Sequence, residues 1–144
     1  MTPLNILLVE DNEGDILLTQ DALIEGMITK EVQVVKDGWE AIQYLDKNGA
    51  YKLASTPDLI LLDINLPKLN GFEVLKKIRS TVATKDIPVV MLSTSCSEND
   101  IKKSSKFHAN CYISKPVDAD DYKNVVSLIK NFWLSKENYP ASKK

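Results

Sequence analysis

Acidic side chains end two apolar segments of the sequence, where carboxylates could hold a metal ion or attack phosphorus. Glu10 and Asp11 follow the apolar run of residues 6–9. Asp63 follows the run of residues 59–62. Neighbouring carboxylates disfavour one another's ionisation, so three of them need a cation or a lysine to compensate their charge. Mg2+ fits this set, because it takes oxygen ligands from one or two carboxylates and further oxygens from phosphate.

Hydroxyl and ammonium groups end two further segments. Ser93 and Thr94 close the run that begins at Val89, and their hydroxyls could hydrogen-bond a phosphoryl oxygen. Lys115 follows "CYIS" and offers a point charge suited to phosphate. A zinc site is disfavoured, because such sites use Cys or His ligands and His108 is the only histidine in the sequence.

These residues also have purely structural explanations. Asp11 and Asp63 could cap a helix or a turn. Ser93 could be a turn residue, and Lys115 a solvated surface charge. Together, however, five groups at adjacent strand ends favour a site: Glu10, Asp11, Asp63, Ser93 and Lys115. In this site Asp63 would be a nucleophile that forms an acyl phosphate. The ion and Lys115 would stabilise charge on the transferring oxygens. Nothing matches the nucleotide-binding patterns GxxxxGKS or GxxxxGKT, so the phosphoryl group is expected to come from another donor.

The strands that carry these side chains must lie side by side. Apolar runs alternate with segments of helical period, which predicts repeated β-α units on one parallel sheet. In the flavodoxin-like strand order 2-1-3-4-5 the first and third strands are neighbours, and ligands bind beyond the carboxyl ends of the strands where the order reverses. We therefore expect an α/β fold with a five-stranded parallel sheet and helices on both faces. The expected strands are residues 4–10, 32–37, 58–63, 86–94 and 111–114.

Apolar residues at helical spacing predict which face of each helix is buried. The fourth helix, capped by Ser97, has only Ile101 and Phe107 as large apolar anchors and is expected to be loosely held. The expected buried positions in the other helices are Leu17, Ala22, Leu23 and Ile24; Trp39, Ile42 and Leu45; Phe72, Leu75, Ile78 and Val82; and Tyr122, Val125, Val126, Ile129, Phe132 and Trp133.

Length and composition fit one globular domain, for which we expect residues 1–135, followed by a flexible polar tail at 136–144. Eighteen basic and twenty acidic residues give a net charge of -2, which disfavours nucleic acid binding. The sequence has no apolar stretch long enough for a membrane span and no signal region, so we expect a cytoplasmic protein without membrane contact. Cys96 and Cys111 are expected to be reduced thiols, because they form no disulfide framework or metal spacing.

Four segments, "LLVEDN", "LILLDINLPKLNGFEVLKKIR", "IPVVMLST" and "CYISKP", resemble in their order and spacing the receiver domain of two-component response regulators. The resemblance extends over about residues 4–132. It implies that Asp63 is the phosphoacceptor. It also implies that Asp11, Asp63 and the backbone carbonyl of Asn65 hold Mg2+, with Glu10 completing the acidic pair.

The resemblance further implies a conformational switch. Ser93 is similar to the switch hydroxyl of the family, Lys115 to its lysine, and Tyr112 to an aromatic residue that swings inward once phosphate engages Ser93. The Lys115–Pro116 bond resembles one that is cis in the family. Two features depart from the family pattern: Thr94 stands where many receivers have Ala, and "KFHANCY" lacks the glycine that precedes the fifth strand.

The partners implied by the resemblance are a sensor histidine kinase and a second copy of the chain. No effector domain follows in the sequence, as in stand-alone regulators. "HANCYISKP" and "FWL" at 132–134 are similar to single-domain regulators that partner phytochrome-type kinases and tend to dimerise through their last helices. Phe132 and Trp133 could supply an apolar patch for a homodimer or could lie in the core, and the sequence favours neither.

Two other functions compete with this interpretation. A phosphatase of the haloacid dehalogenase type also uses a strand-end aspartate with magnesium, but it needs a second Asp two positions later. Asn65 stands there, and an amide cannot donate and retrieve a proton. A scaffold that is never phosphorylated is expected to have lost part of the site. We therefore expect a phosphoacceptor that signals by a population shift between two packings, not an enzyme with turnover.

Overall fold

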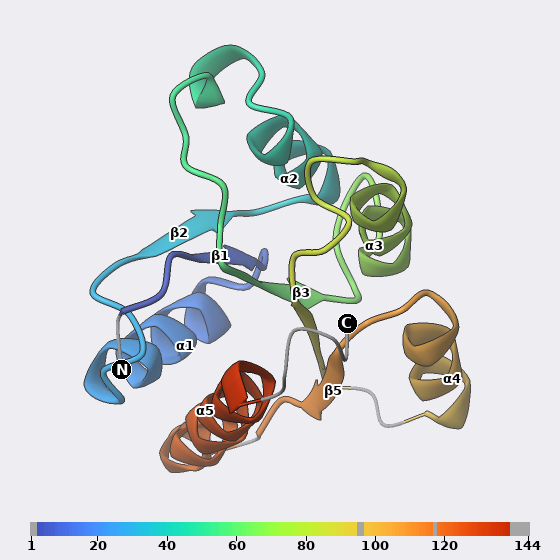
Figure 1. Cartoon of the computed structure of the whole chain (residues 1–144). Helices are drawn as coiled ribbons and strands as arrows, with labels where there is room; N and C mark the ends of the chain where they lie inside the picture. The colour runs from blue at the N-terminus through green and yellow to red at the C-terminus, as the bar shows by residue number, and fades with distance from the viewer. Residues whose placement is uncertain (1–2, 95–96, 117, 139–144) are drawn as a thin grey trace.

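The computed structural model describes residues 3–94, 97–116 and 118–138, and it contains the predicted five-stranded parallel sheet (Figure 1). The strand order is β2-β1-β3-β4-β5, and every adjacent pair is parallel. The strands are β1 (Ile6–Val9), β2 (Val32–Val35), β3 (Leu59–Asp63), β4 (Val89–Ser93) and β5 (Cys111–Ser114). The helices are α1 (Glu13–Glu25), α2 (Gly38–Leu45), α3 (Gly71–Ser80), α4 (Glu98–Lys106) and α5 (Tyr122–Asn138), with short 3-10 turns η1 (Gly49–Tyr51) and η2 (Ala119–Asp121).

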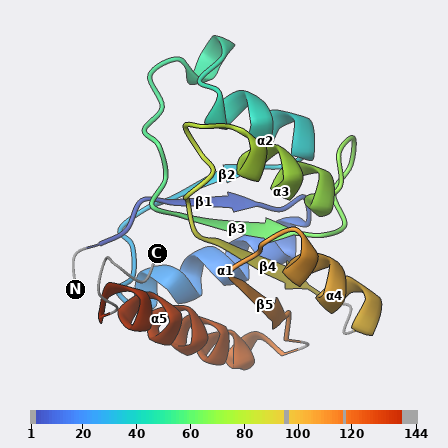
Figure 2. The same ribbon diagram turned by 45° about the vertical axis from the view of Figure 1, so that its right-hand side comes forward.

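Two layers of helices cover the sheet. Helices α1 and α5 lie on one face, and α2, α3 and α4 lie on the other, as Figure 1 and Figure 2 show. Side chains of β3 alternate between the two faces, with Ile60 and Leu62 in the core beneath α2 and α3, and Leu59 and Leu61 in the core beneath α1 and α5. All residues of β3 are buried, as expected of a central parallel strand.

The predicted buried faces are correct for parts of α3 and α5. Phe72, Leu75 and Ile78 of α3 are buried. Val82 is not, because α3 ends at Ser80 and the side chain of Val82 is 84% exposed. In α5 four of the six expected residues are buried, and the other two, Phe132 and Trp133, are partly buried against the core beneath α1 and α5. The buried ones are Tyr122, Val125, Val126 and Ile129.

The predicted faces of α1, α2 and α4 need correction. In α1 the expected burial of Leu23 is confirmed, and Ala22 is partly buried. Leu17 and Ile24 are exposed, because the helix turns Ile16 and Thr19 inward instead. Trp39 of α2 is exposed, and the smaller Gly38 and Ala41 are buried with Tyr44. Ile101 of α4 is exposed, and among the described side chains of α4 only Ser104 is buried. In each helix, contacts with neighbouring elements fix the rotation about the helix axis. Apolar residues at similar spacing on another face therefore end up in solvent.

The end of the chain differs from the predicted tail in one respect. Helix α5 continues to Asn138, so residues 136–138 are helical, and residues 139–144 lie outside the described part of the chain. Cys111 is a free, half-buried thiol, and burial raises its pKa. Cys96 lies outside the described residues. Within the described ranges, no helix combines the length and apolar character needed to cross a bilayer.

Candidate functional site

The carboxyl ends of β1 and β3 bring three carboxylates together. Val9 pairs with Leu62 in the sheet, so the residues that follow each of them, Glu10 and Asp63, lie side by side. Carboxylate oxygens of Glu10, Asp11 and Asp63 all lie within 4.8 Å of one another. Glu10 and Asp63 are buried, with 2% and 6% of their surfaces exposed, whereas Asp11 is exposed. The cluster therefore opens to solvent on the Asp11 side.

Lys115 brings a positive charge into this cluster from β5. Its backbone N–H donates to the carbonyl of Ser93 at 2.7 Å, which fixes the residue at the end of the strand. Its ammonium contacts Glu10 and lies 3.1 Å from an oxygen of Asp15 and 3.4 Å from an oxygen of Asp63. Burial lowers the pKa of Lys115, but the hydrogen bond to Glu10 and the charge of Asp63 outweigh it and raise the pKa above its usual value. Lys115 therefore stays a cation.

The charge in the pocket is incompletely compensated. Burial and the neighbouring Asp63 raise the pKa of Glu10 to about 7, although the hydrogen bond from Lys115 acts in the opposite direction. Burial disfavours the charged form of Glu10, and the like charge of Asp63 adds to this effect. Three oxygen donors within 4.8 Å of one another fit a hard divalent cation, which binds carboxylate oxygens.

The loop after Asp63 is held by close backbone packing. A Cβ atom on Gly71 would lie 2.3 Å from the carbonyl oxygen of Asp63, so only glycine fits there. The N–H of Gly71 donates to the carbonyl of Ile64 at 2.8 Å, and the N–H of Asn65 donates to a carboxylate oxygen of Asp63 at 3.4 Å. Asn70 and Glu73 then form a capping box that starts α3. The loop thus turns back sharply and keeps the Asp63 carboxylate at the edge of the sheet.

The remaining predicted site residues lie at or near the same edge. Asp63 pairs with Leu92, so Ser93 stands one residue beyond it on β4, and its side chain is buried. Thr94 follows in a bend and is exposed. Tyr112 on β5 is half-buried and packs against the core beneath α2 and α3. The backbone of Asn65 contacts Asp63, but the Asn65 residue itself is exposed.

Two residues of this cluster had no predicted site role. Asp15, in the first turn of α1, accepts a hydrogen bond from Lys115, and the hydroxyl of Tyr122 in α5 lies 3.3 Å from the other oxygen of Asp15. The sequence predicts Tyr122 only as a buried position of the last helix, and it predicts no role for Asp15. A usable signal was present: Asp15 comes four residues after Asp11, on a helix that begins at the edge of the sheet where the strands end.

Two sequence features need correction or explanation at β5. The expected cis bond between Lys115 and Pro116 is wrong for this structure, because no peptide bond among the described residues is cis. Before proline the preference between the isomers is small, and the backbone bond to Ser93 already orients Lys115. The missing glycine before β5 has a structural counterpart in His108, whose φ of 66° lies in the left-handed region.

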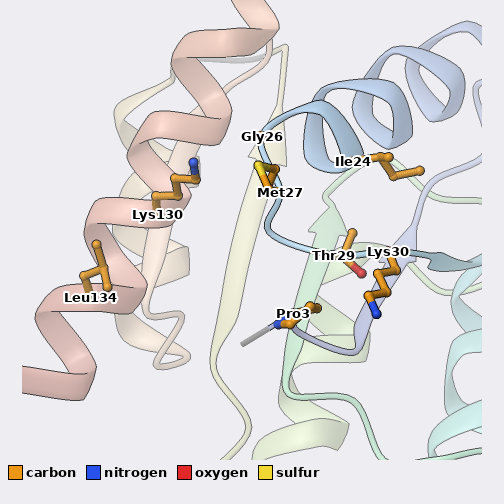
Figure 3. Close-up of a pocket in the computed structure, with 8 residues that line it drawn as sticks. All are labelled: Pro3, Ile24, Gly26, Met27, Thr29, Lys30, Lys130 and Leu134. Carbon is orange, nitrogen blue, oxygen red and sulfur yellow. The ribbon is translucent and has the colours of Figure 1, made fainter. Parts of the chain in front are cut away.

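A separate hollow lies between the segment around Pro3, the turn after α1 and helix α5 (Figure 3). Its volume is about 780 Å³. It contains none of the predicted site residues. The lining residues are Pro3, Ile24, Gly26, Met27, Thr29, Lys30, Lys130 and Leu134.

Comparison with known proteins identifies the family. The response regulator receiver domain matches residues 6–127. The chain belongs to this family of receiver domains. It is a phosphoacceptor protein of two-component signalling. Receiver domains bind a divalent ion at an acidic pocket, and the described residues of this chain include a cluster of three carboxylates. The flavodoxin-like receiver fold predicted from the sequence is confirmed.

Relatives of similar length support this assignment. Response regulator Rcp1 of Synechocystis sp. is 41% identical over 140 residues, covering 97% of this chain and 95% of that protein. The probable methanogenesis regulatory protein FilR2 of Methanothrix harundinacea is 37% identical over 141 residues, covering 96% of this chain and 89% of that protein.

Solved structures of two receivers closely match the fold. The phosphorylated cyanobacterial phytochrome response regulator RcpA has a TM-score of 0.87 and 48% identity, covering 97% of this chain and 100% of that chain. The Mn2+-bound form of Rcp1 has a TM-score of 0.82 and 40% identity, covering 96% of this chain and 100% of that chain.

Proposed function

We propose that Asp63 accepts a phosphoryl group from the phosphohistidine of a sensor histidine kinase. The observation that carries this proposal is the position of the Asp63 carboxylate, buried at a strand end, 3.4 Å from the ammonium of Lys115 and within 4.8 Å of the other carboxylates. We further propose that Mg2+ is the physiological ion, with Asp11, Asp63 and the backbone carbonyl of Asn65 as ligands and Glu10 beside them. When bound, Mg2+ would supply charge compensation to the carboxylates and the phosphoryl oxygens.

The transfer needs few groups from this chain. A carboxylate oxygen of Asp63 attacks phosphorus, the P–N bond to the imidazole of the donor breaks, and its electron pair returns to the ring nitrogen. The product is an acyl phosphate on Asp63. Lys115 stabilises negative charge on the transferred oxygens, and the Ser93 hydroxyl hydrogen-bonds one of them. Asn65 cannot act as a general acid and base, so the acyl phosphate persists and the chain does not turn over phosphate esters.

The signal follows from contacts that exist only with phosphate bound. Engagement of Ser93 shifts the end of β4, and Thr94 and Tyr112 follow, which changes the surface of α4, β5 and α5. Phosphate adds these contacts in one of two packings and so shifts the population toward it.

The kinase partner we propose is of the phytochrome type, because RcpA, at 48% identity, is named as a phytochrome response regulator. The cytoplasm is the location we infer for such a pair. Nucleic acid is not expected as a partner, because the net charge of -2 offers no broad basic field.

We also propose a homodimer through the C-terminal part of α5. Phe132 and Trp133 are only partly buried, and Leu134 beside them is 43% exposed. Changing Phe132 and Trp133 to glutamine should reduce the apparent size in light scattering while circular dichroism stays unchanged. An unchanged size would contradict this interface, and unfolding would show that the two rings belong to the core.

The phosphoacceptor proposal is tested by incubation with Mg2+ and acetyl phosphate, followed by intact mass measurement. The protein should gain the mass of one phosphoryl group, and Asp63→Asn should not. Asp46→Asn, which changes an exposed carboxylate at the end of α2, is the matched control and should label normally. Labelling that persists in Asp63→Asn would contradict the proposal. Steady release of phosphate from small esters would favour the phosphatase, and a folded protein that never labels would favour the scaffold.

A further inference from the structure

Helix α4 has little buried surface to hold it on the sheet. Ser104 is the only buried side chain among its described residues, and Ile101 is 45% exposed. Ser97 caps the start of the helix, and its hydroxyl accepts from the N–H of Asp100 at 3.1 Å, a bond local to the first turn. Phe107, at its C-terminal end, is half-buried and packs against the core beneath α2 and α3. Few core contacts thus oppose a movement of α4.

Reciprocal contacts between α3 and α4 compensate for this weak anchoring. The ammonium of Lys103 on α4 lies 5.6 Å from the ring centre of Phe72 on α3. The ammonium of Lys76 on α3 lies 4.6 Å from the ring centre of Phe107 at the end of α4. The two rings are 6.3 Å apart and tilted by 55°, a favourable arrangement for an aromatic pair. Each helix therefore supplies one ring and one cation to the contact. The ring and the cation from each helix are four residues apart in the sequence.

The C-terminal end of α4 is also fixed by α3. The guanidinium of Arg79 donates to the carbonyl of His108 at 3.0 Å and to the side-chain oxygen of Asn110 at 2.8 Å. Asn110 in turn accepts from the N–H of Val89 on β4 at 2.8 Å. The loop after α4 is thus held to α3 and β4, so α4 can move chiefly by pivoting about this end. Such a pivot would have to separate Lys103 from Phe72.

We propose that Phe72, Lys76, Lys103 and Phe107 form a clasp between α3 and α4 that positions α4 and opposes its displacement during phosphorylation. Phe72 lies in the first turn of α3, directly after Gly71, which packs against the backbone of Asp63. The clasp therefore connects the helix that must move to the segment that follows the phosphoacceptor. Its effect on phosphorylation rests on the function proposed above. Its effect on the mobility of α4 does not.

The contacts of the clasp add to the free energy needed to displace α4. A phosphoryl group that favours a displaced α4 must overcome the contacts that are lost in the displacement. Weakening the clasp therefore raises the fraction of unphosphorylated protein in the displaced packing, and the rate of phosphorylation by a small donor rises with that fraction. One exposed cation–π contact corresponds to a factor of about two to five in such an equilibrium.

Hydrogen exchange of the unphosphorylated protein tests the clasp without any phosphoryl chemistry. In Lys103→Met, which keeps the apolar stem and loses the charge, the amides of α4 should exchange about two- to fivefold faster than in the wild type. Lys103→Arg keeps a cation over the ring and should restore slow exchange. Lys102→Met removes a charge from the neighbouring position on the same helix and should leave exchange unchanged. Lys76→Met should speed exchange by a similar factor from the α3 side.

A second measurement tests the link to the switch. The initial rate of labelling by acetyl phosphate with Mg2+ should rise about two- to fivefold in Lys103→Met and should return to the wild-type value in Lys103→Arg. Unchanged exchange in Lys103→Met and Lys76→Met, or an equal increase in Lys102→Met, would overturn the clasp. Faster exchange with an unchanged or reduced labelling rate would overturn the proposal that the clasp opposes the displacement of α4 during phosphorylation. Loss of labelling in every variant, the wild type included, would instead count against the phosphoacceptor function, and the exchange result would stand.

Discussion

The ammonium of Lys115 lies 3.4 Å from the carboxylate of Asp63 and contacts Glu10 and Asp15 as well. One cation directly after β5 thus compensates a carboxylate that follows β1 and carboxylates on α1 and β3. The side chains of Lys115 and Glu10 are almost fully buried, with 7% and 2% exposed, so solvent screens their attraction little. A single positive charge among these acids leaves the pocket negative, which is the electrostatic basis for a divalent ion beside Asp63.

Replacing Lys115 by methionine should destabilise the protein strongly. Removal of one partner from a buried ion pair leaves uncompensated charge and typically costs about 3–5 kcal/mol of unfolding free energy. Urea unfolding measures this cost. The control is Lys36→Met, which breaks the exposed ion pair with Glu13 and should leave the free energy of unfolding nearly unchanged. Mg2+ should stabilise Lys115→Met more than the wild type, and equal costs in the two variants would contradict the role of Lys115.

Replacing Gly71 by alanine should disturb the phosphoacceptor directly. The new Cβ would lie 2.3 Å from the carbonyl oxygen of Asp63 and 2.8 Å from the Cα of Ile64, and these backbone atoms can yield only if the strand end moves. We expect a loss of about 1–3 kcal/mol of unfolding free energy and slower labelling by acetyl phosphate.

Gly14→Ala is the control for this substitution. Its Cβ would meet only a side-chain atom of Asn12 at 3.3 Å, so stability and labelling should both stay near the wild-type values. If Gly71→Ala labelled as fast as Gly14→Ala, the close packing would not govern the position of Asp63.

Tyr122 should make stability sensitive to alkaline pH. Burial and the nearby charge of Asp15 raise the pKa of Tyr122 to about 12. An unfolded tyrosine titrates near pH 10, so the stabilising contribution is complete below about pH 10 and is lost as pH rises through about 12. Unfolding free energies measured at about pH 9 and about pH 11 should fall more in the wild type than in Tyr122→Phe.

In Tyr122→Phe the fall in unfolding free energy at alkaline pH should be smaller than in the wild type, but it should not disappear. The hydrogen bond to Glu40 raises the pKa of Tyr51 to about 12 as well, so this second tyrosine still contributes to the alkaline decline. An identical decline in the wild type and in Tyr122→Phe would show that Tyr122 is not linked to folding in this way.

Arg79 should be the anchor of the segment between α4 and β5. Its guanidinium donates to the carbonyls of Ile87 at 2.7 Å and His108 at 3.0 Å and to the side chain of Asn110 at 2.8 Å. Hydrogen bonds from a charged group contribute about 1.5–3 kcal/mol each, and some of the acceptors in Arg79→Met would regain water. We expect a net loss of about 2–3 kcal/mol in thermal or urea unfolding. Lys77→Met, on the exposed side of α3, is the control and should change the free energy of unfolding little.

The fold and most of the site could be predicted from the sequence for one physical reason. Strands buried on both faces appear as continuous apolar runs, and parallel strands place their carboxyl ends at one edge of the sheet. The residue type that interrupts each run, an acid at Glu10 and Asp63 and a lysine at Lys115, therefore identifies the edge where a ligand binds. The structure brings these three residues into contact.

Helix rotation could not be predicted in the same way. Leu17, Trp39 and Ile101 all have the spacing of core residues, yet all three are exposed. The close approach of Gly38 to Leu69 turns the Trp39 side of α2 outward, and only the folded chain reveals that approach. The role of Asp15 was missed for a related reason, since its contact with Lys115 depends on how α1 lies against the end of β5.

The most direct test of the account is the chemical location of the phosphoryl group. After treatment with acetyl phosphate and Mg2+, borohydride reduces an aspartyl phosphate to homoserine, and tandem mass spectrometry of the peptides locates the reduced residue. The account predicts homoserine at position 63 alone. Homoserine at position 11, or a gain of phosphoryl mass with position 63 unreduced, would contradict it.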